Sequence, residues 1–364
     1  MKLYSIPSNS FGRLLSEALV IGHFVSRTNS NILACTQEHI CNSFILETLA
    51  QELPISNSSI HRKLYNFLIR IKFRFLILNH DDIFGEHDFF YQLMEAQRKY
   101  RERLLTLNHS IKFTKLVEFK SRPIILFATR TNDYWNSKNE KLESGLDLRN
   151  SSIDWTEAVI GMLIENNFSV IRIGAERSAA LSIRSNFFFD YSLSEMRSEK
   201  SDFEMCNHAD FAVTTGGGIS LLPSLMGVPS LMVNTGLFSD LQPQEFLSHY
   251  LPKSVYSIVD DRPLTTFELS ELDLCFMQRD SHYSSKGLEI RDVTPEDALM
   301  AVKHFSEIVA RRASLQSSSS FKKGNFMEIP EILRDRFPAN IKLPESGLAI
   351  GIKVSKLWKN LQSN

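Results

Sequence analysis

A glycine-rich loop is the sharpest chemical feature of the sequence. The run Thr214-Thr215-Gly216-Gly217-Gly218-Ile219-Ser220 follows an apolar stretch and precedes a short predicted helix over 220–226, with Pro223 in its first turn. Glycines let the backbone approach a ligand closely, and the free N–H groups at a helix start attract anions. The pattern predicts a nucleotide phosphate here, and a tight turn that binds no ligand is the equally open alternative. The loop is neither GxGxxG nor a Walker A motif, so neither dinucleotide binding nor P-loop chemistry is supported.

Arginines at predicted strand ends are the second feature. Arg130 directly follows the apolar run 123–129, Arg149 lies in Asp147-Leu148-Arg149-Asn150, and Arg172 lies within the run 169–173. Ligands of parallel α/β sheets collect outside the carboxyl ends of the strands, and a guanidinium binds phosphate oxygens in a bidentate manner. We therefore expect Arg130 to bind phosphate. For Arg172, a phosphate contact and a structural ion pair are equally open.

Three further side chains are candidates for hydroxyl binding or proton transfer. Asp190 follows an apolar run and Asp202 leads into a short predicted helix, and either could accept a hydrogen bond from a sugar or ribose hydroxyl. A helix cap is the favoured reading for Asp202 because Ser201-Asp202 lies where a helix is expected to begin. His23, at the end of the first predicted helix, has the chemistry of a general base, although a lone helical histidine is more often structural.

No motif points to metal or hydrolase chemistry. The sequence has no GxSxG, no HExxH, no EF-hand loop and no Asp-x-Asp triplet. Its four cysteines, which follow no ligand spacing, predict buried thiols in a reducing compartment; they are Cys35, Cys41, Cys206 and Cys275. We therefore expect no metal site.

The composition is typical of a soluble globular protein and does not indicate binding to a polyanion. Hydrophobic residues make up 43% and charged residues 23%, and the formal net charge is −1, so no nucleic-acid partner is expected. The N-terminus turns polar within ten residues, and no stretch has the length of a membrane span. These features predict a cytoplasmic protein. The basic segment 60–78 is most simply a solvated face, with contact to an anionic membrane surface as the alternative.

Strands alternating with helices predict parallel βαβ units in two sets. In the first set we expect strands at 2–6, 32–35 and 73–79 and helices at 11–24, 42–52, 60–71 and 86–106. In the second set we expect strands at 123–129, 169–173, 211–215 and 230–234 and helices at 152–166 and 292–312. Thr294 and Pro295 supply the cap and first turn of the last helix.

The domain organisation follows from these two sets. We predict an N-terminal Rossmann-like domain over 1–119 and a second Rossmann-like domain over 120–313. A serine-rich linker spans 314–324, and 325–364 form a tail with a terminal helix.

The motifs of the second set, taken in order, resemble bacterial glycosyltransferases of surface-polysaccharide biosynthesis. The residues that carry the resemblance are Phe127-Ala128-Thr129-Arg130, Asp147-Leu148-Arg149-Asn150, Val170-Ile171-Arg172-Ile173-Gly174, Asp190-Tyr191, Thr215-Gly216-Gly217-Gly218, and Val228-Pro229 through Val233-Asn234. The runs 292–297 and 347–352 also resemble the tail of the family. The sequence departs from the family pattern in the third glycine, Gly218, and in Thr131-Asn132-Asp133 after the arginine.

This resemblance implies an α/β, GT-B-like fold in which two Rossmann-like domains have parallel sheets facing a central cleft. It places the donor in the C-terminal half and the acceptor in the N-terminal half. The strand end at Arg130 also looks like the donor-phosphate arginine of fucosyltransferase-type enzymes. The implied activity is transfer of a sugar from a nucleoside-diphosphate sugar to a glycan or lipid-linked acceptor, without a metal or another cofactor.

Roles for individual residues follow on this hypothesis. Arg130 and the backbone of Gly216–Gly218 stabilise the leaving nucleoside diphosphate in place of a divalent ion, and His23 is the base for the acceptor hydroxyl. The remaining predicted donor contacts are Arg149, Arg172, Gly174, Asp190, Thr215 and Asn234. A sugar-nucleotide epimerase or hydrolase of the same fold, and a non-catalytic carbohydrate-binding relative, are the alternatives.

Overall fold

The computed structural model describes residues 2–6, 11–28, 32–36, 55–56, 61, 63, 119–131, 148, 150–174, 180–236, 248–272, 274, 277 and 280–315. The chain divides into two compact units, with the described residues before Asn108 in the first and those after His109 in the second. The domain boundaries expected from the sequence, at 119–120, 313–314 and 324–325, stay predictions, as does a cleft shared by the two sheets.

The first unit contains a parallel βαβ element. Strand β1 (Lys2–Ile6) pairs with β2 (Ile32–Thr36), which pairs with β3 (Ile55–Ser56), and helix α1 (Phe11–Thr28) joins the first two. The buried face of α1 includes Leu14, Leu15, Ala18 and Ile21, whose spacing in the sequence is typical of the apolar face of a helix. These elements confirm the predicted strands at 2–6 and 32–35 and the helix that begins at residue 11.

The other elements predicted for the first hundred residues lie outside the described part of the chain. They are the helices at 42–52 and 86–106 and the strand at 73–79. Of the basic segment 60–78, which contains the predicted helix 60–71, only residues 61 and 63 are described.

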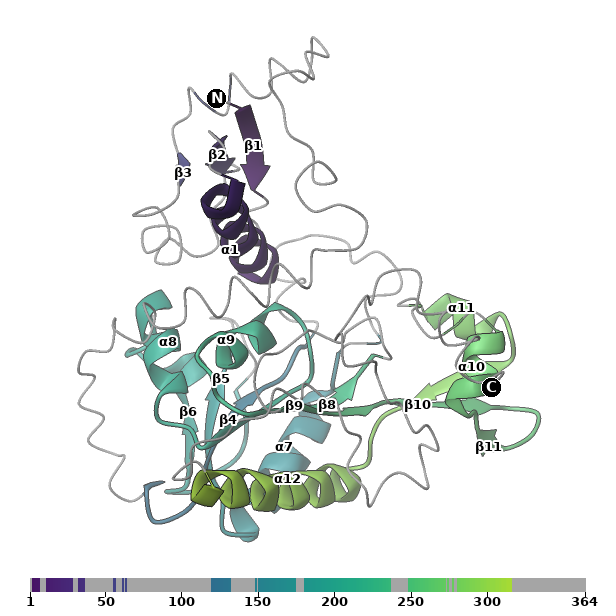
Figure 1. The fold of residues 1–364 in the computed structure, drawn as a ribbon. Helices are drawn as coiled ribbons and strands as arrows, with labels where there is room; N and C mark the ends of the chain where they lie inside the picture. The colour runs from purple at the N-terminus through teal and green to yellow at the C-terminus, as the bar shows by residue number, and fades with distance from the viewer. Residues whose placement is uncertain are drawn as a thin grey trace. The chain divides into compact units, whose positions relative to one another are not determined.

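A six-stranded, wholly parallel sheet forms the second unit (Figure 1). In spatial order the strands are β6 (Phe188–Asp190), β5 (Ser169–Ile173), β4 (Ile124–Ala128), β7 (Phe211–Thr214), β8 (Ser230–Thr235) and β9 (Ser248–Pro252). All four strands predicted for this half are present as β4, β5, β7 and β8. The strands β4, β5, β7 and β8 are buried along their whole length and mostly apolar, as expected of a sheet covered on both faces.

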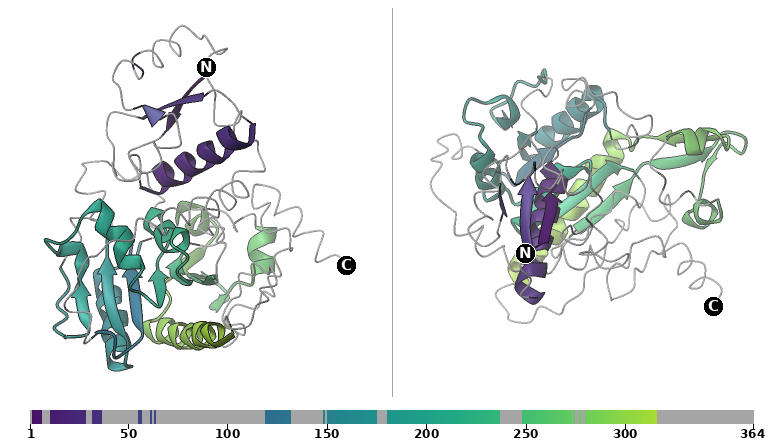
Figure 2. Two further views of the ribbon diagram at one scale, coloured as in Figure 1. Left: turned by 60° about the vertical axis from the view of Figure 1, so that its left-hand side comes forward. Right: turned by 90° about the horizontal axis from the view of Figure 1, so that it is seen from above.

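Helices pack on the two faces of this sheet (Figures 1 and 2). On one face lie α7 (Ile153–Glu165) and α12 (Pro295–Leu315), whose apolar residues share a core with alternate residues of the strands, among them Phe127, Val213 and Phe305. On the other face lie α8 (Glu199–Cys206) and α9 (Leu221–Leu225). The side chain of Thr294 accepts a hydrogen bond from the N–H of Asp297 at 3.1 Å, so the predicted cap of α12 is confirmed. The expected linker and tail lie outside the described residues beyond Leu315.

The strand order contains a reversal that positions the site. The chain builds β4, β5 and β6 outward in one direction, then returns to place β7 beside β4 and builds β8 and β9 in the other direction. This is the strand order of a Rossmann fold, in which ligands bind at the point where the direction reverses. The predicted fold class, α/β with parallel sheets, is confirmed.

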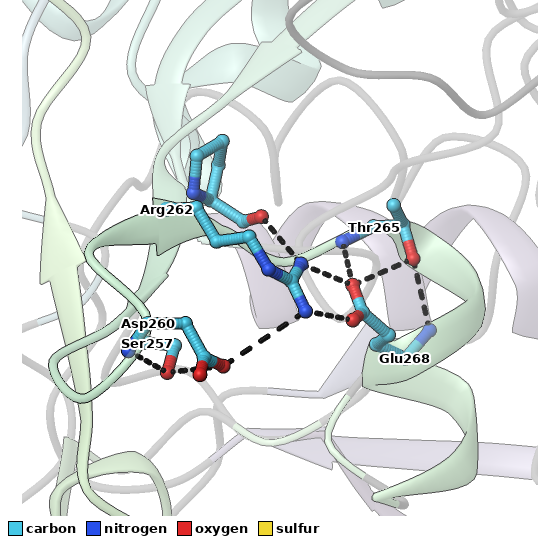
Figure 3. Close-up of polar contacts among 6 residues, drawn as sticks. Ser257, Asp260, Arg262, Thr265 and Glu268 are labelled. Carbon is cyan, nitrogen blue, oxygen red and sulfur yellow. Dashed lines mark hydrogen bonds and ion pairs between the residues drawn. The ribbon is translucent and has the colours of Figure 1, made fainter.

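A small antiparallel sheet follows β9 and was not expected from the sequence. It contains β10 (Ser254–Ser257), β11 (Arg262–Pro263) and β12 (Leu288–Arg291), with the short helices α10 (Thr266–Glu271) and α11 (Asp280–Ser284). Its own apolar core is closed by Leu148, and the buried Tyr283 donates to the carbonyls of Leu274 and Met277 at 2.9 and 2.8 Å. Figure 3 shows the polar contacts that tie β11 to α10 through Arg262 and Glu268.

Candidate functional site

The reversal of strand order lies between β4 and β7, and the two strongest candidates from the sequence meet there. Arg130 follows the carboxyl end of β4, and the loop Thr215–Gly218 follows the carboxyl end of β7. The two strands are parallel neighbours with Ala128 beside Thr214. The sheet therefore brings together a guanidinium and a glycine loop that are 85 residues apart in the chain.

Contacts between the two segments fix the backbone on both sides. The N–H of Arg130 donates to the hydroxyl oxygen of Thr215 at 2.8 Å, and the N–H of Thr215 donates to the carbonyl of Ala128 at 3.0 Å. A Cβ added at Gly217 would lie 3.5 Å from Cδ and 3.8 Å from a guanidinium nitrogen of Arg130. The half-buried arginine side chain therefore lies over the glycine loop rather than away from it.

Two of the three glycines have backbone angles that require glycine. Gly216 has φ +89° and Gly217 has φ +84° with ψ −178°, a combination that side chains with a Cβ rarely adopt. Gly218 begins a short 3₁₀ turn, Gly218–Ser220, in which the Ser220 hydroxyl donates to the carbonyl of Gly217 at 2.5 Å. The loop is thus a fixed backbone structure, and α9 after it has five residues.

Two hydroxyl groups at the same strand ends are buried without a hydrogen-bond partner among the described residues. They are the side-chain oxygens of Thr129, which precedes Arg130, and Thr214, which precedes Thr215. Buried hydroxyls normally have a hydrogen-bond partner, because a buried donor or acceptor that makes no hydrogen bond costs about 1–3 kcal/mol of stability. Each of these hydroxyls is a potential hydrogen-bond donor next to the Arg130 strand end or the glycine loop.

Arg172 and Asp190 form an ion pair with each other. They are register partners on β5 and β6, and a guanidinium nitrogen of Arg172 lies 2.9 Å from a carboxylate oxygen of Asp190. Ser192 donates to the other oxygen of Asp190 at 2.5 Å, and the arginine side chain is 2% exposed. Of the two roles left open for Arg172, the structural one is therefore present; the donor contacts expected of both residues stay predictions.

The carboxyl end of β5 is held by a neighbouring polar cluster. The carbonyl of Gly174 accepts a hydrogen bond from Nε of Arg197 at 3.1 Å, and Arg197 also lies 3.8 Å from the carboxylate of Asp202. The N-cap of α8 is Ser198 rather than Asp202, which lies within the first helical turn. Burial, and then the charge of Asp202, raises the pKa of Tyr191 above its ordinary value. Tyr191 is therefore a neutral hydroxyl over the working pH range.

Asn234 is fully buried at the end of β8, and both ends of its side chain are hydrogen-bonded. Its amide nitrogen donates to the hydroxyl of Ser151 at 2.9 Å, and its amide oxygen accepts from the N–H of Val293 at 2.8 Å. Its φ of +57° lies in the left-handed region, which asparagine tolerates better than most residues. The predicted contact of Asn234 with a donor hydroxyl stays a prediction.

Sequence reasoning missed a buried lysine at the same edge. Lys253, between β9 and β10, is 5% exposed; its ammonium donates to the carbonyl of Asn150 at 2.8 Å and to the carboxylate of Asp292 at 2.6 Å. No local motif marks this residue. A lysine that alone separates two short strands is typical of a solvated turn, and the burial of Lys253 depends on Asn150 and Asp292, which are 103 and 39 residues away in the chain.

Two site candidates cannot be placed in this way. His23 lies in α1 of the first unit, but its side chain lies outside the described residues, as does Arg149.

Among the described residues no group of three histidine, cysteine or acidic side chains could hold a metal ion. No helix within the described ranges is long and apolar enough to cross a membrane. Cys35 and Cys206 are buried and form no disulfide, and burial raises the pKa of the Cys206 thiol.

Comparison with known proteins gives distant structural similarities only. No family model and no curated protein matches the sequence. The ADP-heptose LPS heptosyltransferase II of E. coli is similar over 86% of this chain and 100% of its own, at 10% identity and a TM-score of 0.48. A glycosyl transferase family 9 protein of Veillonella parvula is similar over 69% of this chain and 86% of its own, at 10% identity and a TM-score of 0.38. For the S. aureus MnaA–UDP structure the shares are 64% and 79%, with 9% identity and a TM-score of 0.39. At these values the similarities assign no activity to this chain.

Proposed function

We propose that this protein is a GT-B-like glycosyltransferase that binds the diphosphate of a nucleoside-diphosphate sugar at the reversal between β4 and β7. The observation that carries the proposal is the position of Arg130, whose side chain lies over Gly217 at the carboxyl edge of a Rossmann-ordered sheet. A fixed cation above a close-approach glycine loop suits a phosphate group. The resemblance of this strand end to the donor-phosphate arginine of fucosyltransferase-type enzymes points the same way.

In this proposal the leaving group is stabilised by the protein alone. When the bond between the sugar and the diphosphate breaks, negative charge develops on the diphosphate, and Arg130 together with the loop N–H groups stabilises it. The hydroxyls of Thr129 and Thr214, which have no partner among the described residues, add donors at the same strand ends. A divalent ion is then not required, which is why we propose a metal-independent reaction.

The acceptor half of the reaction is assigned to the first unit. We propose a glycan or lipid-linked acceptor whose hydroxyl loses its proton to His23, in α1. Arg149, Arg172, Gly174, Asp190 and Thr215 complete the proposed donor-side set, and the buried Asn234 belongs to the hydrogen-bonded framework behind it. This combination best supports sugar transfer in surface-polysaccharide biosynthesis. The proposed enzyme is cytoplasmic, with or without contact to the membrane surface.

Titration calorimetry of the purified protein with ADP, UDP, GDP and CDP in EDTA tests the diphosphate site. We expect one nucleotide to bind, and we expect R130A to lose at least about tenfold in affinity, since a charged hydrogen bond is worth about 1.5–3 kcal/mol. Arg184 provides the matched control, because it is exposed and precedes the amino end of β6, on the opposite edge of the sheet. R184A removes the same charge and should bind like the wild type.

Incubation of the protein with nucleoside-diphosphate sugars of the base that binds distinguishes the alternative functions. Release of the nucleotide from its sugar, or isomerisation of the donor, without any acceptor would favour an epimerase or hydrolase. Absence of binding by all four nucleotides, both in EDTA and with added Mg²⁺, would refute the proposal and favour a non-catalytic carbohydrate-binding protein. Binding that disappears in EDTA would refute metal independence alone.

A further inference from the structure

A chain of hydrogen bonds leads from Asn234, on β8, to the backbone of Arg130, on β4. Asn234 donates to the hydroxyl of Ser151 at 2.9 Å, and the N–H of Ser151 donates to the carbonyl of Arg130 at 2.9 Å. The N–H of Arg130 donates in turn to Thr215 at 2.8 Å. The N–H and the carbonyl of Arg130 are therefore each hydrogen-bonded, one to the glycine loop and the other to the segment that precedes α7.

The segment at Asn150 and Ser151 is also held by residues that follow β9 and precede α12. Lys253 donates to the carbonyl of Asn150 at 2.8 Å, and its charge is paired with Asp292 at 2.6 Å. The N–H of Val293, the next residue, donates to Asn234 at 2.8 Å. Two strand ends and the start of α12 thus hold this segment, so it has a single position relative to Arg130.

We propose that Asn234 is a positioning residue for Arg130 and acts through Ser151 without touching the donor. The proposal rests on the phosphate-binding role of Arg130 proposed above. The side chain of Asn234 is 0% exposed, and each end of it has a protein partner, so it cannot present its amide to a sugar hydroxyl while this network is intact. This positioning role replaces the direct contact with the donor that the sequence suggests for Asn234.

Positioning of this kind matters because an arginine side chain is long and has many rotamers. The direction of the Arg130 backbone decides where the guanidinium can reach, and a displacement of about 1 Å at a charged group is enough to lower a rate or an affinity strongly. Asparagine meets both local requirements at position 234. It accepts a left-handed φ, and its amide supplies one donor and one acceptor in fixed geometry.

Two variants interrupt this series of hydrogen bonds at different points. N234G keeps a residue that tolerates φ +57° but deletes both side-chain hydrogen bonds, and S151A deletes only the hydroxyl that accepts from Asn234. S152A is the matched control: Ser152 is the next residue and caps α7 by accepting from the N–H of Trp155 at 3.1 Å, but it is not part of the chain. Loss of the cap lowers stability without disturbing Arg130.

The experiment measures the affinity for whichever of ADP, UDP, GDP and CDP binds the wild type most tightly, with weak affinities read by ligand-observed NMR. We expect N234G and S151A each to lower the affinity by about tenfold, as loss of supporting hydrogen bonds does at other sites. We expect neither to lower it further when combined with R130A. S152A should leave the affinity unchanged.

Three results would overturn the inference, and they separate it from the proposed function. Wild-type affinity in folded N234G and S151A would show that the network is structural only. An equal loss with and without R130A would show that Asn234 acts independently of Arg130. Both results leave the proposed function intact, whereas failure of the wild type to bind any of the four nucleotides would overturn both. If N234G does not fold, S151A decides the outcome by the same criteria.

Discussion

Replacement of Gly217 by alanine tests whether the glycine loop is held in a backbone conformation that only glycine adopts easily. The added Cβ would lie 3.5 Å from Arg130 Cδ, which is ordinary van der Waals contact, so crowding adds little. The cost comes instead from φ +84° and ψ −178°, a region worth about 1–3 kcal/mol of strain for other residues. Alanine also restricts the unfolded chain, which offsets about 0.4–1 kcal/mol. We therefore expect G217A to be less stable by about 1–2 kcal/mol.

Two other glycines serve as controls. Gly161 lies inside α7 with no atom within 4 Å of an added Cβ, so G161A should stabilise the protein by about 0.5–1 kcal/mol. Gly287 has φ +68° and equally open surroundings in the small sheet, so G287A should be destabilised by about 1 kcal/mol through backbone strain alone.

Urea unfolding gives the stabilities, and calorimetry with the best-binding nucleoside diphosphate gives the affinities. Relief of the strain moves the loop beneath Arg130, so G217A should also bind at least about tenfold more weakly, while G161A and G287A should bind like the wild type. Wild-type stability in G217A would refute the conformational reasoning. Equal losses of affinity in G217A and G287A would refute the link between this loop and the ligand.

Two further outcomes follow from ionisable groups. Hydrogen bonds from Arg262, and then from the backbone of Thr265, lower the pKa of Glu268 from 4.5 to about 2, so its carboxylate stabilises the fold above pH 4.5 and this contribution is lost as the pH falls toward 2. The difference in melting temperature between wild type and E268Q should therefore be largest near neutral pH and shrink through that window; a constant difference would contradict it. Burial, and then the charge of Asp202, raises the pKa of the Cys206 thiol, so a thiol reagent at pH 8 should label Cys206 only as the protein unfolds. Mass spectrometry of the Cys206 peptide checks this, and rapid labelling of the native protein would contradict it.

Four of the six strands of the main sheet, β4, β5, β7 and β8, were predictable because each is a compact and mostly apolar run, whereas β6 and β9 were not expected. Residues 124–128 and 169–173 are buried along their whole length, and such runs between helical patterns indicate parallel sheets. The strand order was not predictable, because nothing local in β7 says that it returns to pair with β4. The sequence therefore identified Arg130 and the loop 215–218 as separate candidates. That the two lie in contact could be seen only from the strand order of the folded sheet.

The small antiparallel sheet escaped prediction for a different reason. Its strands are two to four residues long and mixed in polarity, and one of its core residues, Leu148, comes from more than 100 residues before the rest. The roles of Arg172 and Lys253 were undecided or missed because burial of a charged residue depends on tertiary partners such as Asp190 and Asp292. A charged residue type is compatible both with an exposed or ligand-binding side chain and with a buried ion pair, so it does not decide between them.

The segment that forms the small sheet, residues 254–291, begins and ends at neighbouring positions in space. Ser254, where β10 begins, is the register partner of Arg291, where β12 ends, and the flanking residues Lys253 and Asp292 are joined by an ion pair. A segment whose two ends meet is separable in evolution, because insertion, loss or exchange there leaves both flanks where they were. Residues 254–291 are in this sense a removable module. A change within this module therefore leaves the ordered strands of the main sheet and the arginine–glycine contact in place.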